Sequence, residues 1–224
     1  MTEILHWSYV YFSFKLSSHP LISYQDFLPK LKDHVLSRLF GHIYDGVNQT
    51  YTDDEHDSVE IVYNRLYKHK AMRVNYTTYD MRREQDTINP RTRPDIMLLS
   101  HEDENDSYHP YWYARVLGIF HVNIRHTGPR SRTPHVQKIE LVFVRWFGRN
   151  LEHAAGWSAR RLHRVGFLSA DSPGAFDFID PFDIICGVHM IPAFAHGKLS
   201  ELGKPVSQRP ADDDEDWLYY YVGM

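Results

Sequence analysis

Three consecutive segments decide the fold: PYWYARVLGIFHVNIRH (110–126), TGPRSRTPH (127–135) and VQKIELVFVRWFGR (136–149). β-Branched and aromatic residues, which favour strands, dominate the first and third segments. The second segment is polar and contains one glycine and two prolines, which interrupt strands. The pattern predicts a long β-hairpin. Because both arms are apolar on nearly both faces, we expect most of the hairpin to lie inside a small barrel or sandwich.

Alternation along each arm predicts which side chains share a face. In the first arm, one predicted face carries Trp112, Ala114, Val116, Gly118 and Phe120, and the other carries Tyr113, Arg115, Leu117, Ile119 and His121. In the second arm, the two predicted sets are Ile139, Leu141, Phe143 and Arg145, and Glu140, Val142, Val144 and Trp146.

Composition limits the class of protein. The length of 224 residues favours one domain, with or without appendages. The formal net charge of −4 gives no bulk attraction to nucleic acid. The single cysteine, Cys186, excludes an intrachain disulfide and a multi-cysteine zinc site, and it fits an intracellular compartment. The apolar N-terminal stretch is too short to span a bilayer and lacks a basic leader, so neither secretion nor membrane insertion is indicated.

One helix is predicted over residues 23–40. Its aliphatic stripe consists of Leu28, Leu31, Val35 and Leu39. Ser23 and Asp26 resemble a capping box, and Gly41 is suited to end the helix. Three regions are expected: an N-terminal extension over 1–57, a β domain over 58–194 and a polar, acidic tail over 195–224.

Further strands are predicted within the β domain over 58–67, 70–80, 95–100, 159–168 and 183–194. Residues 81–94 are charged and end in prolines, which predicts a loop or short helix, and residues 169–181 are expected to be a turn-rich connection. The last eight residues, WLYYYVGM, are too aromatic to be free in solution. They either pack back onto the domain or begin a strand that continues beyond this sequence.

Motifs for catalysis are missing. The sequence has no nucleophile elbow, phosphate-binding loop, dinucleotide fingerprint or HExxH zinc motif. Asp95 resembles part of a metal-dependent nuclease motif, but no acidic residue followed two places later by lysine lies on the next strands. His101 and His109 lie beside acidic residues in a segment expected to be exposed. We therefore predict no enzyme activity, metal, cofactor or small-molecule substrate, unless polar residues converge in a deep pocket.

Arginine clusters could form local positive patches despite the negative net charge. They comprise Arg82, Arg83, Arg91, Arg93, Arg130, Arg132, Arg160, Arg161 and Arg164. With interleaved aromatic residues, such clusters bind phosphate backbones or single strands of nucleic acid. The alternative is that these arginines pair with the acidic loops.

The tryptophans of the hairpin offer another candidate. Trp112 and Trp146 fall near the same end of the two arms. Two or three ring faces and a carboxylate together hold a methylammonium ion by cation–π attraction. The alternative is that both indoles only fill the core.

The segments YWYARVLGIF, VFVRWFGR and DPFDIICGVHMIP resemble three landmarks of the bromo-adjacent homology (BAH) domain, over roughly residues 68–194. The resemblance implies a partly closed β-barrel that mediates protein contacts in chromatin, in some members by reading methylated lysine on histone tails. Carried over by position, the cage aromatics fall at Trp112 and Trp146, with Phe167 as a third ring and Glu152 as the carboxylate. This chain departs from the family pattern around Phe167 and Glu152, because the acid-rich segment that usually follows the tryptophan strand is replaced by GRNLEHAAGW.

A second resemblance covers nearly the whole chain. YTTYDMRREQDTINPRTRPDIMLLS, HPYWYARVLGIFHV and DEDWLYYYV are similar to a C-terminal segment of large reading frames associated with fungal DNA transposons of the Plavaka/CACTA-like and KDZ kind. This resemblance implies a nuclear, chromatin-facing setting. The expected partner is a chromatin protein or histone peptide, with DNA as the alternative. The expected fold is mainly β, BAH-like and partly closed, with one N-terminal helix and irregular tails.

Overall fold

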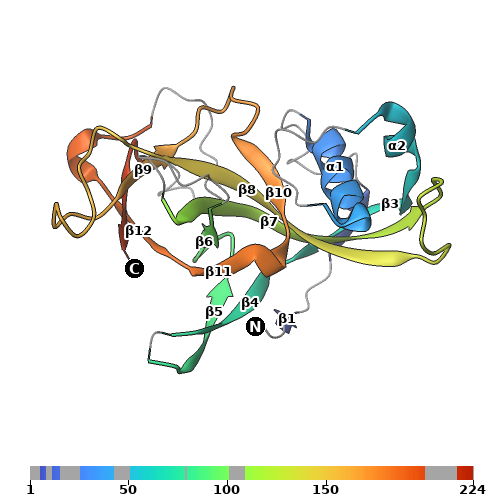
Figure 1. The fold of residues 1–224 in the computed structure, drawn as a ribbon, viewed down its shortest axis with the longest axis horizontal. Coiled ribbons are helices and arrows are strands. Elements are labelled where there is room, and N and C mark those ends of the chain that lie inside the picture. Colours follow the sequence, from blue (N-terminus) through green and yellow to red (C-terminus); the bar gives the residue numbers. More distant parts are fainter. Residues whose placement is uncertain are drawn as a thin grey trace.

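The computed structural model describes residues 6–8, 12–15, 26–42, 51–78, 80–100, 109–199 and 216–223. Within these ranges the protein is mainly β, as predicted (Figure 1). The helices are α1 (Phe27–Phe40), α2 (Asp53–Asp57) and the short 3-10 helices η3 (Pro181–Asp183) and η4 (Phe194–His196). The strands are β1 (His6–Ser8), β2 (Phe12–Lys15), β3 (Val59–His69), β4 (Ala71–Thr77), β5 (Arg83–Ile88), β6 (Asp95–Leu99), β7 (Tyr111–His126), β8 (Gln137–Arg149), β9 (Arg164–Phe167), β10 (Phe176–Ile179), β11 (Ile184–Gly187), β12 (His189–Pro192) and β13 (Tyr220–Gly223).

Ten of the described strands form one sheet around the hairpin β7–β8. The main path runs β11-β6-β7-β8-β9-β13-β12, while β10 pairs with β8, and β3 pairs with β7 and β2. The path is not closed by hydrogen bonds in the described part of the chain, but its two ends, β11 and β12, are consecutive in sequence. The predicted strand 183–194 is therefore two strands. They part at Val188, whose N–H donates to the carbonyl of Asp95 (2.9 Å).

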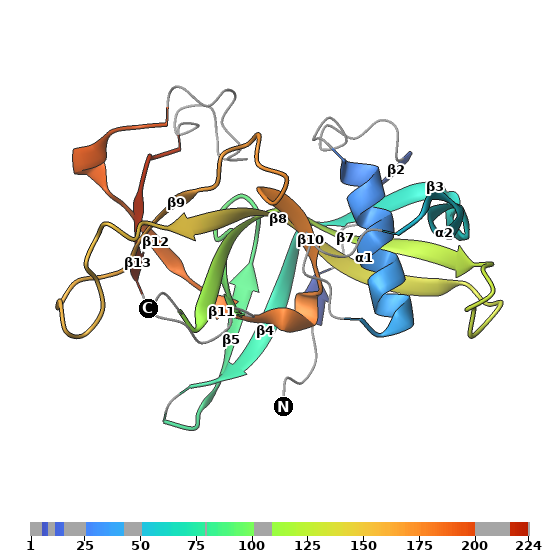
Figure 2. The ribbon, with the colours of Figure 1, turned by 45° about the horizontal axis from the view of Figure 1, so that its top comes forward.

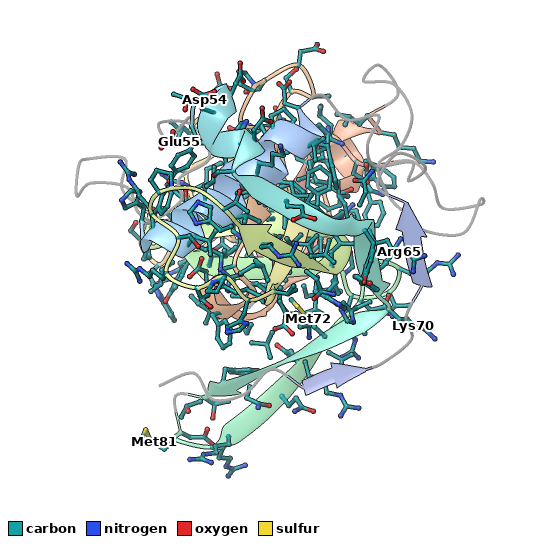
Figure 3. The ribbon with its side chains drawn as sticks, turned by 90° about the vertical axis from the view of Figure 1, so that its right-hand side faces the viewer. Asp54, Glu55, Arg65, Lys70, Met72 and Met81 are labelled. Atoms are coloured by element: carbon teal, nitrogen blue, oxygen red, sulfur yellow. The ribbon has the colours of Figure 1, made fainter. Side chains whose placement is uncertain are left out.

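A second, three-stranded sheet has the order β1-β4-β5. Its hairpin β4–β5 projects from the body, with Met81 near its tip (Figure 3). The prediction of a loop or short helix over 81–94 was wrong for β5. This strand is charged because its side chains are mostly exposed, so it lacks the apolar alternation of a half-buried strand.

The predicted hairpin is confirmed, and its arms pair from Tyr113 opposite Phe147 to Ile124 opposite Gln137. The predicted faces are correct for β8 and for the first part of β7. A β-bulge between Val116 and Gly118 adds one residue to β7, so the faces beyond it are exchanged. Phe120 consequently packs in the cluster under α1, on the face opposite Trp146.

Helix α1 covers one face of the hairpin near its turn (Figures 1 and 2). Phe27 packs edge to face on Phe143 and Phe178, with ring centroids 5.0 Å apart in each pair. As predicted, the helix ends at Gly41, whose φ of 74° suits glycine. Its start is later than predicted, because Asp26 occupies the N-cap position with a left-handed backbone and no side-chain cap. Ser23 lies outside the described residues.

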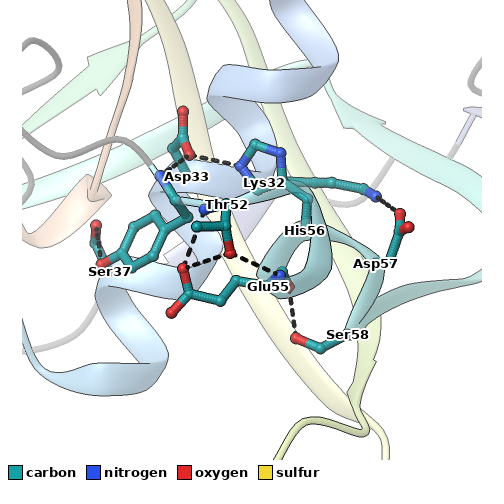
Figure 4. A network of polar contacts seen from close by, with 9 residues as sticks. Lys32, Asp33, Ser37, Thr52, Glu55, His56, Asp57 and Ser58 are labelled. Carbon is teal, nitrogen blue, oxygen red and sulfur yellow. Dashed lines mark hydrogen bonds and ion pairs between the residues drawn. The ribbon is translucent and has the colours of Figure 1, made fainter.

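The buried face of α1 also differs from the predicted stripe. Leu28 is exposed, whereas Asp33 is buried. Asp33 accepts hydrogen bonds from His56 Nε2 (2.6 Å) and from the N–H of Tyr51 (3.3 Å), which link α1 to α2 (Figure 4). Helix α2 lies in the N-terminal extension, where only the helix over 23–40 was predicted, although Thr52 and Glu55 form the capping box that marks a helix start.

Like β5, the strands β10 and β13 lie outside the strand ranges predicted for the β domain. β10 falls within the expected turn-rich connection and pairs Phe176–Ile179 with β8. β13 falls within the expected C-terminal tail and pairs with both β9 and β12. The aromatic C-terminal residues therefore pack back onto the sheet.

Candidate functional site

The structure brings Trp112 and Trp146 together. Ala114 of β7 lies opposite Trp146 of β8, and Trp112 is two residues before Ala114, so the indoles are diagonal neighbours on one face. Their ring centroids are 5.7 Å apart and the ring planes meet at 77°, an edge-to-face contact.

Both indoles are half-buried, so neither is sealed in the core nor fully open. Trp146 packs against the buried cluster formed with β4, β5 and β6, and Trp112 lies opposite Leu98 of β6. The buried cluster supports Trp146, and both side chains keep part of their surface in solvent. The two indoles are therefore neither buried in the core nor fully exposed.

The other two predicted cage residues do not join this pair. Phe167 lies opposite Phe147 in the sheet and stacks on it with a centroid distance of 4.2 Å. Phe147 and Trp146 are consecutive in β8 and point to opposite faces, so Phe167 lies behind the sheet from the indoles. Glu152 is exposed in the turn after β8, where its N–H donates to Asn150 Oδ1 (3.0 Å).

The face opposite the indoles holds a buried network of charges. Arg115 and Arg145, each 2% exposed, are directly opposite each other on β7 and β8. Arg115 donates to both carboxylate oxygens of Asp95 (2.7 and 3.1 Å) and to Asp216 Oδ1 (2.8 Å). Asp216 Oδ2 also lies 3.9 Å from Arg145 Nη1. The network therefore pairs two guanidinium groups with two carboxylates.

Aromatic rings enclose these charges. Arg115 lies over the rings of Phe147, Phe167 and Tyr220, and Arg145 lies 4.2 Å from the centroid of Phe167. Burial alone would lower the pKa of Arg115, but Asp95 and Asp216 outweigh burial and raise the pKa further above its ordinary value. Phe167, predicted as a cage wall, is thus part of the shell around buried arginines.

Sequence reasoning missed the role of Asp216, which it placed in an acidic tail. The available signal was the two arginines within apolar strands, because buried guanidinium groups need anionic partners. Asp95, considered for nuclease chemistry, is one of those partners and is engaged by Arg115.

The predicted arginine surface is divided among separate places. Arg82 and Arg83 lie in the β4–β5 hairpin, Arg91 and Arg93 between β5 and β6, Arg130 and Arg132 in the β7–β8 turn, and Arg160, Arg161 and Arg164 in or before β9. The last two groups lie at opposite ends of the 13-residue β8, or roughly 40 Å apart at the rise of a strand. The structure does not combine these arginines into one patch.

Some of the arginines are paired, as the alternative predicted. Arg82 is 2.9 Å from Asp80, and Arg130 is 3.9 Å from Glu55. Of the predicted histidine patch, His101 lies outside the described residues. His109 is buried with its ring centroid 4.5 Å from that of His163, and the described residues contain no cluster of three potential metal ligands.

Comparison with known proteins adds no further assignment. Neither family models nor curated proteins nor solved structures gave a match to this chain. Among the described residues, no helix has the length and apolar character needed to cross a bilayer. The chain is a mainly β protein organised on one long hairpin, β7–β8.

Proposed function

We propose that this chain is a non-enzymatic interaction module of BAH type, of transposon origin and nuclear setting, that docks a chromatin protein through a histone-tail peptide. The observation that carries the proposal is the perpendicular, half-buried pair of Trp112 and Trp146 on adjacent strands. The alternative from the sequence, an accessory nucleic-acid-binding domain of a transposase that uses the arginine patches over 82–93, 130–132 and 160–164, is less favoured as a whole because those patches lie apart.

The ring geometry suits a cation. A cation is attracted to a ring face within about 6 Å of the centroid, and indole is the strongest partner among the aromatic side chains. Two indoles at 77° provide two walls of a corner. A methylated ammonium group in that corner would contact both faces and shed water more easily than an unmodified lysine.

The arrangement of the three landmark segments supports the BAH likeness. The first two are β7 and β8, which pair with each other. The third contains β11, which pairs with β6, and β6 pairs with β7. The three segments are therefore close neighbours in one sheet. The third segment also contains β12, so it supplies both ends of the main strand path, β11 and β12, as expected of a small β module.

The test is a titration of the full chain with methylated and unmethylated histone-tail peptides, followed by fluorescence anisotropy. We expect a methylated peptide to bind, and Trp112→Leu or Trp146→Leu to weaken that binding by about 2- to 30-fold, because leucine fills space without a ring face. Trp112→Phe keeps a ring and should lose less.

Trp157→Ala is the matched control, because this third tryptophan is fully exposed in the loop between β8 and β9 and is not part of the pair. Thermal melting of each variant separates lost binding from lost folding. A folded protein that binds no peptide in either methylation state would remove the proposed function.

A further inference from the structure

The loop between β8 and β9 is a structured projection, here called the finger (residues 150–163). Its base is closed by the N–H of Asn150, which donates to the carbonyl of Arg164 (2.9 Å). Its tip is closed by an antiparallel bridge between Gly156 and Arg161, with the N–H of Gly156 donating to the carbonyl of Arg161 (2.8 Å). The finger extends from the end of the molecule opposite α1 (Figures 1 and 2).

Trp157 lies at the tip of the finger and is 100% exposed. It begins a turn in which the N–H of Arg160 donates to the carbonyl of Trp157 (3.2 Å), and Arg160 has a left-handed backbone with φ 52°. A turn of this kind keeps its first and fourth Cα atoms within about 7 Å. The backbone therefore presents an indole and a guanidinium close together on a fixed support.

The finger is a positive site on an acidic chain. The finger contains two arginines (Arg160 and Arg161) and one acid (Glu152), a formal charge of 2 − 1 = +1, and Arg149 and Arg164 flank its base, whereas the whole chain carries −4. Arg160 and Arg161 are exposed, and neither forms an ion pair with any described residue. This differs from the β4–β5 hairpin and the β7–β8 turn, where Arg82 and Arg130 face Asp80 and Glu55.

We propose that the finger binds single-stranded nucleic acid, with a base stacked on Trp157 and the neighbouring phosphates held by Arg160 and Arg161. Single strands present an unstacked base face beside a phosphate, and an exposed indole next to guanidinium groups is complementary to both. A duplex offers the phosphates but not the base face. This inference concerns a different site from the indole pair on β7 and β8 and does not rest on the peptide function.

The experiment measures binding of the full chain to a short labelled oligothymidylate, the matching oligouridylate and a duplex of equal length at several salt concentrations. We expect the single strands to bind more tightly than the duplex. Trp157→Ala should weaken single-strand binding by about 5- to 150-fold, the range of one lost base stack. Trp157→Phe, which keeps a ring, should weaken it less.

Charge reversal tests the phosphate contacts. The double variant Arg160→Glu/Arg161→Glu should weaken binding and reduce the slope of log K against log salt by about 1.4, or about 0.7 for each lost contact with a single strand. Arg91→Glu/Arg93→Glu is the matched control, because it makes the same change in net charge at two exposed arginines outside the finger. All these positions are exposed, so melting temperatures should stay close to the wild type.

Three outcomes would overturn the inference: no binding to either single strand, binding unchanged by Trp157→Ala, or tighter binding to the duplex. Trp157-dependent association with anionic phospholipid vesicles in the absence of oligonucleotide binding would also overturn it, and would assign the finger to a membrane surface. Equal loss in the control double variant would show that general charge, not the finger, attracts the strand.

Discussion

Asp216 is the residue whose replacement tests the buried charge network most directly. It is 5% exposed, accepts a hydrogen bond from Arg115 Nη1 (2.8 Å) and lies 3.9 Å from Arg145. Asp216→Asn preserves the size of the side chain and one carbonyl oxygen while it removes the charge. Arg115 would then keep the carboxylate of Asp95, and Arg145 would lose the carboxylate that lies 3.9 Å from its Nη1.

The expected loss follows from that imbalance. Removing one partner from a buried ion network costs about 3–5 kcal/mol, because an uncompensated charge remains in a medium of low polarity. For a domain of this size, about 2–4 °C of melting temperature corresponds to each kcal/mol, so Asp216→Asn should melt roughly 6–20 °C lower. Adding Arg145→Met should recover much of the loss, because it restores charge balance and leaves an apolar side chain between aromatic rings.

The assay is urea and thermal unfolding followed by circular dichroism. Asp80→Asn is the control, because it removes an exposed carboxylate 2.9 Å from Arg82, a surface pair worth at most about 1 kcal/mol. If Asp216→Asn costs no more than Asp80→Asn, the network does not stabilise the sheet in the way argued here. The same conclusion would follow if Arg145→Met made the Asp216→Asn protein still less stable.

Two further predictions concern packing and protonation. Gly166→Ala should destabilise the protein by about 1–3 kcal/mol in urea unfolding, because its Cβ would lie 2.9 Å from the backbone carbonyl oxygen of Leu218. Gly148→Ala is the control: it lies opposite Gly166 in the sheet, but its Cβ would meet the end of a leucine side chain, so it should destabilise the protein less. Equal losses of stability would contradict the argument. His34 is buried, and its pKa is lowered from 6.5 to about 3, mainly by desolvation and secondly by the charge of Arg38. The unfolded state therefore takes up a proton at higher pH than the folded state, so the stability of the protein falls as the pH drops from about 6.5 towards 3. His34→Leu should reduce that slope by about 1.4 kcal/mol per pH unit in unfolding measured between pH 6 and 4. His135→Leu, which replaces an exposed histidine, is the control.

Sequence patterns were sufficient where a run of apolar residues marks a buried strand. The arms of the hairpin β7–β8 and the strand β6 were predicted because their apolar residues and flanking turn residues are local signals. β5 was not predicted, because an exposed strand has no reason to alternate. The exchange of faces in β7 was not predictable either, because the extra residue at Leu117 is defined only by its pairing with β8.

In the candidate site, too, the features set by local sequence were predictable and those set by long-range pairing were not. Trp112 and Trp146 were expected to meet because both lie near the open end of one hairpin, and that follows from local register. Phe167 was assigned to the indoles by family position, but its face is set by pairing of β9 with Phe147. Asp216 reaches Arg115 from 101 residues away in the chain, a separation over which no local pattern reports proximity.

The two faces of the hairpin depend on one register. Arg115 and Arg145 point to one side of β7 and β8, and their neighbours Ala114 and Trp146 point to the other. A slip of one residue would move the indole into the charged interior and the guanidinium groups towards the apolar cluster, and both changes are costly. The arginines, once paired with Asp95 and Asp216, therefore fix the register in which the indoles of Trp112 and Trp146 meet. On this argument the buried charges have a positioning role for the proposed peptide site, although they lie on the opposite face of the sheet.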